Sequence, residues 1–334
     1  MRFLIFAARS VLEPQEAVTC EPNVREVEDD RSPAEPAASP AGARAPSRDV
    51  IFVVGMSRSG TSALARVVAM CGGMLPQRLL PANFANPTGY WESERAVELN
   101  DEFLAAHGSS WYDGSLALNA GLVGAAERRT FVSVIADFFD GEVAAGGPLV
   151  VKDPRITGLL PYWTAAARVA GLSVKILHVF REPAEVVASL AQRDGLAADH
   201  ALALWLKYNL VGERDARAFP RAFVAYDELI EDWEDAVARC IARLGLGITI
   251  GDAMRPAVAG FLQPELRHHR GAAIESGAQT AALAAIARET YELLRSGARE
   301  PVRTADFDEI LRAYAASRAP LEFRLSRSLM ARPR

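Results

Sequence analysis

Short apolar runs alternate with longer amphipathic stretches over most of the chain. The apolar runs have the length and composition of buried strands, and they fall at residues 51–54, 149–151, 174–180 and 223–226. Between them, apolar residues recur at the spacing of a helix face, as in 93–107, 122–139, 198–219 and 229–244. This alternation is typical of a parallel sheet with helices on both faces. We therefore predict an α/β fold with a helical C-terminal part, in which helices lie near 281–294 and 307–316.

The beginning of the sequence lacks that pattern. Residues 13–48 are rich in proline, alanine, glutamate and arginine and show no hydrophobic period. A segment of this composition cannot bury enough apolar surface to offset the entropy lost on ordering. We expect residues 1–48 to be a disordered leader and residues 49–334 to form a single domain.

Composition narrows the possible ligands. The chain of 334 residues has a formal net charge of -5 and a sequence pI of about 5.7. This balance argues against broad, charge-driven binding to nucleic acid. The three cysteines are widely spread and have neither disulfide nor metal spacing, and no apolar run reaches the roughly 18 residues of a membrane span. We expect a cytoplasmic protein with no transmembrane segment and no metal.

The first apolar run leads directly into a loop bounded by Gly55 and Gly60. A strand, a glycine-bounded loop and a helix N-terminus together favour anion binding, because backbone N–H groups and the helix dipole converge there. The P-loop of ATPases reads G-x-x-x-x-G-K-[ST]. Here Thr61 occupies the lysine position, Ser62 matches, and a cation stands earlier, at Arg58. The P-loop-like cradle is kept, but the missing lysine disfavours an ordinary kinase or NTPase. The alternative is that the loop is only a tight strand-to-helix turn with no ligand.

A second candidate phosphate site follows the third apolar run. Arg181 ends that run, and Ser189 stands eight residues later, about two turns into the following helix. Both side chains can face the same ligand and share a second phosphate. The alternative is that Arg181 pairs with Glu182 or Glu185 and that Ser189 is a small packing residue.

Taken together, the two motifs resemble those of sulfotransferases that use 3′-phosphoadenosine 5′-phosphosulfate (PAPS). The resemblance covers residues 49–270 and is to bacterial members of the family. It implies that the 5′-phosphosulfate is held by Ser57, Arg58, Ser59, Gly60, Thr61 and Ser62, and the 3′-phosphate by Arg181 and Ser189. It also implies that Tyr226 contacts adenine, although this tyrosine could instead pack on the sheet edge. The implied reaction is metal-free, in-line transfer of a sulfuryl group to an acceptor hydroxyl or amine of a carbohydrate, lipid or small molecule. The product of PAPS is then adenosine 3′,5′-bisphosphate (PAP).

The base of this reaction is predicted in the long loop after the first helix. Several sulfotransferase branches resemble this arrangement and have a glutamate at that place, so Glu92 is the first candidate. A partly buried carboxylate has a raised pKa and is a better base near neutral pH. The alternative is that Glu92 caps the helix predicted from Ser93, since acidic residues suit helix starts.

Lys152 and Asp153 are the other catalytic candidates. The strand before them resembles the one that ends in Lys-Thr-His in cytosolic sulfotransferases, where lysine stabilises charge and histidine is the base. Lysine is kept here, but Pro154 stands at the histidine position. We therefore assign Lys152 to charge stabilisation. Asp153 is either a rival base or a partner that orients Arg155 or Lys152.

Two other functions are compatible with the same residues. One is a P-loop kinase of a small molecule, which needs Lys152 to act from a different strand. The other is a non-catalytic nucleotide-binding module. The basic segment Arg267–Gly271 loosely resembles the family segment that closes on the 3′-phosphate, and a solvated turn is the alternative.

Overall fold

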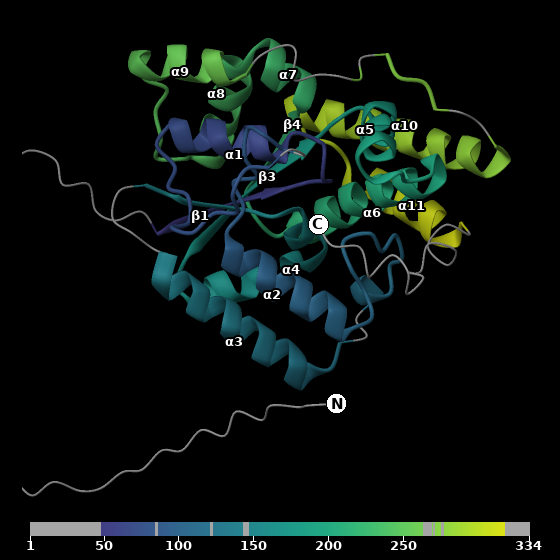
Figure 1. Cartoon of the computed structure of the whole chain (residues 1–334), viewed down its shortest axis with the longest axis horizontal. Helices are drawn as coiled ribbons and strands as arrows, with labels where there is room; N and C mark the ends of the chain where they lie inside the picture. Colours follow the sequence, from purple (N-terminus) through teal and green to yellow (C-terminus); the bar gives the residue numbers. More distant parts are fainter. Residues whose placement is uncertain are drawn as a thin grey trace, which may run out of the picture. The chain divides into compact units, whose positions relative to one another are not determined.

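The computed structural model describes residues 48–83, 86–120, 123–142, 147–262, 269, 271–274 and 277–317. The chain divides into two units, 1–43 and 44–334, and all described residues belong to the second. The predicted leader therefore lies outside the described residues, apart from Arg48. Figure 1 shows the described part as a central sheet between groups of helices.

The sheet has four parallel strands in the order β2-β1-β3-β4. These are β1 (Asp49–Val54), β2 (Leu149–Lys152), β3 (Ser173–Phe180) and β4 (Arg221–Ala225). The register aligns Val53 with Lys152 and Phe180 with Ala225. All four strands therefore end at one edge, where ligands bind in open parallel sheets. The predicted fold class, a parallel sheet with helices on both faces, is confirmed.

Side chains of β1 alternate between the two faces of the sheet. Val50, Phe52 and Val54 pack in one core, whereas Ile51 and Val53 pack in another. The first core is covered by α2 (Glu94–Ala106), α3 (Ala125–Glu142) and α4 (Pro154–Val169). The second is covered by α1 (Thr61–Met70), α8 (Trp233–Leu244) and α9 (Arg255–Phe261). In Figure 1 these two sets of helices lie on opposite sides of the strands.

A third core lies beside β3 and β4. It is formed with α5 (Pro183–Asp194), α6 (Ala198–Ala216), α10 (Ala278–Arg299) and α11 (Thr304–Ala316). Trp205 on α6 is fully buried there and donates a hydrogen bond to the backbone oxygen of Arg181 at 3.0 Å. This core thus supports the end of β3, which is followed directly by the candidate site residue Arg181.

Several predicted helix boundaries were wrong. The helix expected through 229–244 is two helices, α7 (Tyr226–Glu231) and α8, because Asp232 begins a new helix by accepting a hydrogen bond from the backbone N–H of Asp235 at 3.2 Å. The segment α9 and the short 3-10 helices Leu118–Ala120 and Asp252–Met254 were not predicted. Among the described helices, none has the length and apolar composition to cross a bilayer.

Candidate functional site

The loop between β1 and α1 has a backbone that requires its glycines. Gly55 has φ 138° and Gly60 has φ 91°, a region that side chains rarely adopt. A Cβ at Gly55 would lie 2.1 Å from the backbone oxygen of Val179, and one at Gly60 would lie 2.1 Å from the ring of Tyr226. Gly60 is also the N-cap of α1 and provides no side-chain acceptor. The backbone N–H groups of the first turn are therefore available to an anionic ligand.

A buried threonine on α4 fixes the start of this loop. The hydroxyl of Thr157 accepts a hydrogen bond from the N–H of Gly55 at 2.9 Å and donates one to the oxygen of the same residue at 3.2 Å. Thr157 is fully buried. The phosphate loop is thus tied to the helix that follows Lys152 and Asp153.

Replacing Thr157 with valine is expected to lower the free energy of unfolding by about 1–3 kcal/mol, because both polar groups of Gly55 lose their partner in a buried place. Urea denaturation measures this change. Thr164→Val is the matched control on the same helix, since its hydroxyl donates only one bond, at 3.3 Å, to the nearby Pro161 oxygen. Equal losses in the two variants would contradict the proposed anchoring role.

Two arginines meet at the phosphate loop. Arg58 has φ 71°, and its Nε donates to the hydroxyl of Ser189 at 2.9 Å. Arg181 donates from Nε to Glu185 at 2.7 Å and from Nη1 to the backbone oxygen of Arg58 at 3.4 Å. Its Nη2 is buried and finds no hydrogen-bond partner among the described residues. The structure therefore brings together side chains that the sequence assigned to two different phosphates.

The electrostatics of this cluster favour an anion. Burial lowers the pKa of Arg58, and the positive charges of Arg193 and Arg181 lower it further. The guanidinium of Arg181 lies 4.7 Å from the ring centroid of Tyr226. Tyr226 is 5% exposed and packs against Gly60, so the predicted adenine contact stays a prediction while the packing contact is observed. Ser59 is fully buried, and its hydroxyl has no partner within the described part of the chain.

Lys152 joins the phosphate loop to the candidate base. Its Nζ donates to the hydroxyl of Ser62 at 3.1 Å, to the backbone oxygen of Tyr90 at 3.1 Å and to Oε1 of Glu92 at 2.7 Å. An ammonium group has three protons, so these contacts use its full donor capacity. Lys152 is 2% exposed and Glu92 is 4% exposed. Two of the three predicted catalytic residues thus form a buried ion pair beside the loop.

Glu92 does not cap the helix that follows it. Ser93 is the N-cap of α2, and its hydroxyl accepts from the N–H of Ala96 at 3.4 Å. The carboxylate of Glu92 points instead to Lys152. Burial raises the pKa of Glu92, and the charge of Lys152 opposes this rise. The result is a carboxylate with the raised pKa that suits a base.

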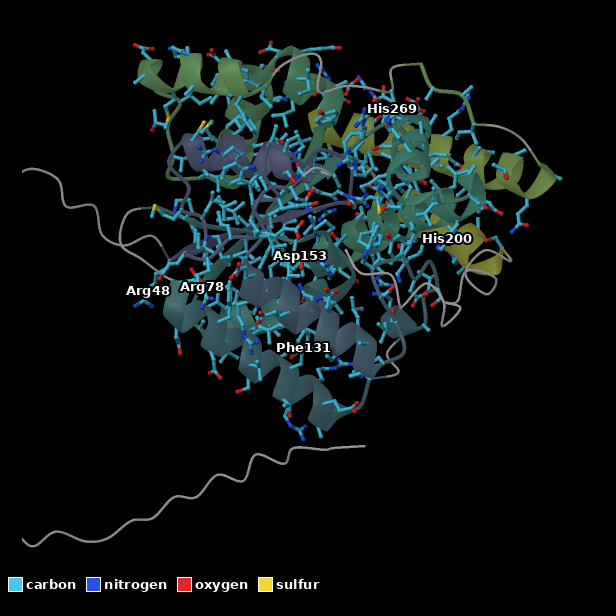
Figure 2. All side chains as sticks on the ribbon, viewed as in Figure 1. Arg48, Arg78, Phe131, Asp153, His200 and His269 are labelled. Carbon is cyan, nitrogen blue, oxygen red and sulfur yellow. The ribbon has the colours of Figure 1, made fainter. Side chains whose placement is uncertain are left out.

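Asp153, which Figure 2 labels, belongs to a second buried network next to this pair. Its Oδ1 accepts from Nη1 of Arg155 at 2.6 Å, and its Oδ2 accepts from the side-chain amide of Asn100 at 2.9 Å. Arg155 also donates from Nε to Asp101 at 2.6 Å, and its Nη1 lies 3.8 Å from Oε2 of Glu92. With both oxygens occupied, Asp153 has the contacts of an orienting partner for Arg155.

Sequence reasoning missed the α2 side of this network. Asn100 also accepts a hydrogen bond from the indole N–H of Trp163 at 2.8 Å and is fully buried. One signal was present: Asn100 lies four residues after Ala96 and three before Phe103, on the apolar stripe of the helix. A lone amide on an apolar stripe indicates a buried polar partner.

The other candidate residues are only partly described. Residues 267, 268 and 270 of the basic segment lie outside the described residues. Trp91 has φ 56°, and the guanidinium of Arg66 lies 4.4 Å from its ring centroid, so the tryptophan packs on α1. Within the described ranges, no group of three or more His, Cys, Asp or Glu side chains has a geometry that could hold a metal ion.

No protein-family model matches the chain, and no curated protein matches its sequence. Solved structures similar to it are sulfotransferases. The sulfotransferase domain of the Synechococcus PCC 7002 olefin synthase is 15% identical, with a TM-score of 0.41 over 83% of this chain and 98% of that one. The sulfotransferase domain of the curacin biosynthetic pathway is 16% identical, with a TM-score of 0.37 over 80% and 98%. Mouse sulfotransferase SULT7A1, solved in complex with PAP, is 13% identical, with a TM-score of 0.33 over 83% and 87%. The family predicted from the motifs is the family of these structures. The identities and TM-scores are low, so these structures carry no activity over to this chain.

Proposed function

We propose that the protein is a sulfotransferase that moves a sulfuryl group from PAPS to an acceptor hydroxyl. The observation that carries this proposal is the position of Lys152, which contacts Ser62 on the phosphate-loop helix and the buried carboxylate of Glu92. One cation thus lies between an anion cradle and a base. Sulfuryl transfer needs this combination, because negative charge develops on the leaving oxygen while the acceptor loses a proton.

The donor fits the groups that surround the loop. Backbone N–H groups of the first turn of α1, together with Arg58 and Arg181, are suited to phosphate oxygens. The unpartnered Nη2 of Arg181 and the buried hydroxyl of Ser59 are further donors for such oxygens. PAPS supplies the sulfuryl group and a phosphate leaving group.

The protein residues then have separate tasks. Arg58, Arg181 and the loop orient the donor, while Lys152 stabilises charge at the bridging oxygen. Because Lys152 already uses all three protons, it must release at least one present acceptor to contact the donor. Loss of its contact with Glu92 would free this carboxylate, which then accepts the acceptor's proton. Asp153 holds Arg155, and Arg155 keeps Glu92 in position.

Small-molecule phosphorylation is the second candidate function. The observation in its favour is the 3.1 Å contact between Lys152 and Ser62, since a lysine from a neighbouring strand reaches the loop. Parallel assays with radiolabelled PAPS and γ-labelled ATP on the same acceptor extracts separate the two. Transfer of sulfate alone supports our proposal, and transfer of phosphate alone supports the kinase. Binding of PAP without turnover of either donor identifies a nucleotide-binding module.

Replacing Arg58 or Arg181 with alanine is expected to weaken PAP binding by about 10- to 150-fold, the effect of losing one charge-assisted hydrogen bond of roughly 1.5–3 kcal/mol. Isothermal titration calorimetry measures the affinity. Arg95→Ala on the exposed side of α2 is the control, because the side chain of Arg95 pairs with Glu98 at 3.2 Å, away from the phosphate loop. Wild-type PAP affinity in both arginine variants would contradict the assignment of Arg58 and Arg181 to the donor site.

A further inference from the structure

A small cavity adjoins the site on the other side of Arg155. Its volume is about 20 Å³, which is enough for at least one water-sized group. Three leucines form its apolar walls, and five polar side chains also line it: Ser110, Asn119, Arg155, Lys207 and Tyr208. The guanidinium of Arg155 lies 3.8 Å from Glu92, so this cavity is one side chain away from the candidate base.

Two buried polar atoms around the cavity lack a partner within the described ranges. The Nε and Nη1 groups of Arg155 are held by Asp101 and Asp153, and Nη2 is left without an acceptor. The amide of Asn119 donates to the oxygen of Gly158 at 2.9 Å, which leaves its Oδ1 without a donor. One unpaired donor and one unpaired acceptor thus belong to the same cavity.

Lys207 adds further donor capacity. It is 6% exposed, and its Nζ donates to the backbone oxygen of Asp113 at 2.6 Å. Burial lowers the pKa of Lys207 to about 8, and Asp113 opposes this change. The amine is therefore mostly a cation at pH 7 and has protons beyond the one given to Asp113.

The charges around the cavity disfavour an anionic ligand. Arg155 is already surrounded by the carboxylates of Glu92, Asp101 and Asp153, and Asp113 lies beside Lys207. A further carboxylate would also turn its lone pairs toward Oδ1 of Asn119. A hydroxyl suits Arg155, Lys207 and Asn119 together, because its oxygen can accept from the two cations while its proton is donated to Asn119.

We infer that this cavity receives a second hydroxyl of the acceptor, so that the substrate is a polyhydroxylated compound, such as a diol or sugar. One hydroxyl lies at Glu92 for transfer, and another lies between Arg155, Lys207 and Asn119. This inference rests on the proposed function. An acceptor without the second hydroxyl leaves buried polar groups unpaired, which is a strong basis for discrimination.

The test uses the full chain, labelled PAPS and matched pairs of probes: linear diols against primary alcohols of equal length, and methyl pyranosides against their monodeoxy forms. We expect kcat/KM to be at least about tenfold higher for the member with the additional hydroxyl. In Lys207→Met this ratio falls to near one and the KM for the polyol rises. Asn119→Ala gives the same loss of preference and is the second variant if Lys207→Met does not fold. Lys175→Met, a half-buried lysine on β3, is the matched control and keeps the wild-type ratio.

Equal kcat/KM within the pairs would overturn the inference and leave the cavity as a site for a water molecule. So would failure of every probe to accept sulfate from PAPS while the acceptor extracts do accept it. Absence of sulfate transfer to probes and extracts alike, or absence of PAP binding in calorimetry, has a different meaning, since it removes the proposed function itself. The assay with extracts and the calorimetry therefore separate failure of the acceptor assignment from failure of the proposed function.

Discussion

Replacing Glu92 with glutamine is expected to lower kcat by about 10²- to 10⁴-fold, the contribution of a positioned general base. Glutamine keeps the shape of the side chain but cannot take the proton of the acceptor hydroxyl. Lys152 and the phosphate loop are unchanged, so PAP affinity should stay within a few-fold of the wild type. Steady-state kinetics with labelled PAPS and calorimetry with PAP measure the two quantities on the same preparation.

The pH profile gives a second readout of Glu92. Protonated Glu92 cannot accept a proton, so kcat/KM should fall as the pH falls through its pKa. Burial raises this pKa, hence the acid limb lies above the ordinary glutamate value of about 4.3. Glu92→Gln should show no such limb. If Glu92 had only a structural role, the acid limb would still be present in Glu92→Gln.

Glu94→Gln is the control for this substitution. Glu94 stands two residues later in the first turn of α2, is partly exposed and pairs with Arg78 at 3.5 Å. We expect it to keep kcat within about twofold, since exposed ion pairs contribute little. Wild-type kcat in Glu92→Gln would exclude this residue as the base. Asp153 would then be an unsuitable replacement, because both its oxygens already accept hydrogen bonds.

The sheet, its edge and the phosphate loop were predictable because their signals are local. Apolar runs define the strands, and the parallel arrangement places all strand ends at one edge. Gly55, Gly60 and the missing lysine at Thr61 can be read from consecutive residues. The same holds for Lys152, which follows an apolar run directly.

The remaining contacts depend on packing between distant elements. Arg58 and Ser189 are 131 residues apart in sequence and are joined by one hydrogen bond, which no local pattern indicates. Asn100 meets Asp153 because α2 and α4 pack on the same face of the sheet. The break at Asp232 was missed because the apolar period continues through it, although aspartate is a favoured N-cap.

Replacing Arg155 with methionine is expected to lower the free energy of unfolding by about 3–5 kcal/mol, because it leaves buried carboxylates without their cation. Arg155 is 2% exposed and is the partner of Asp153, Asp101 and Glu92. These three negative groups raise its pKa despite its burial. Methionine fills much of the volume, so the loss measures the charge and its hydrogen bonds rather than a cavity.

Arg168→Met near the end of the same helix is the matched control for Arg155→Met, because Arg168 is exposed and stacks on Phe219 at 4.7 Å. Its free energy of unfolding should change by no more than about 0.5 kcal/mol. Arg155→Lys separates charge from geometry: it keeps the cation but lacks the planar fork that serves Asp153 and Asp101 together, so an intermediate loss is expected. Urea denaturation of the three variants at pH 7 measures their free energies of unfolding. If Arg155→Met and Arg168→Met lose the same stability, the buried network does not hold the catalytic edge together, and Glu92 must be positioned by Lys152 alone.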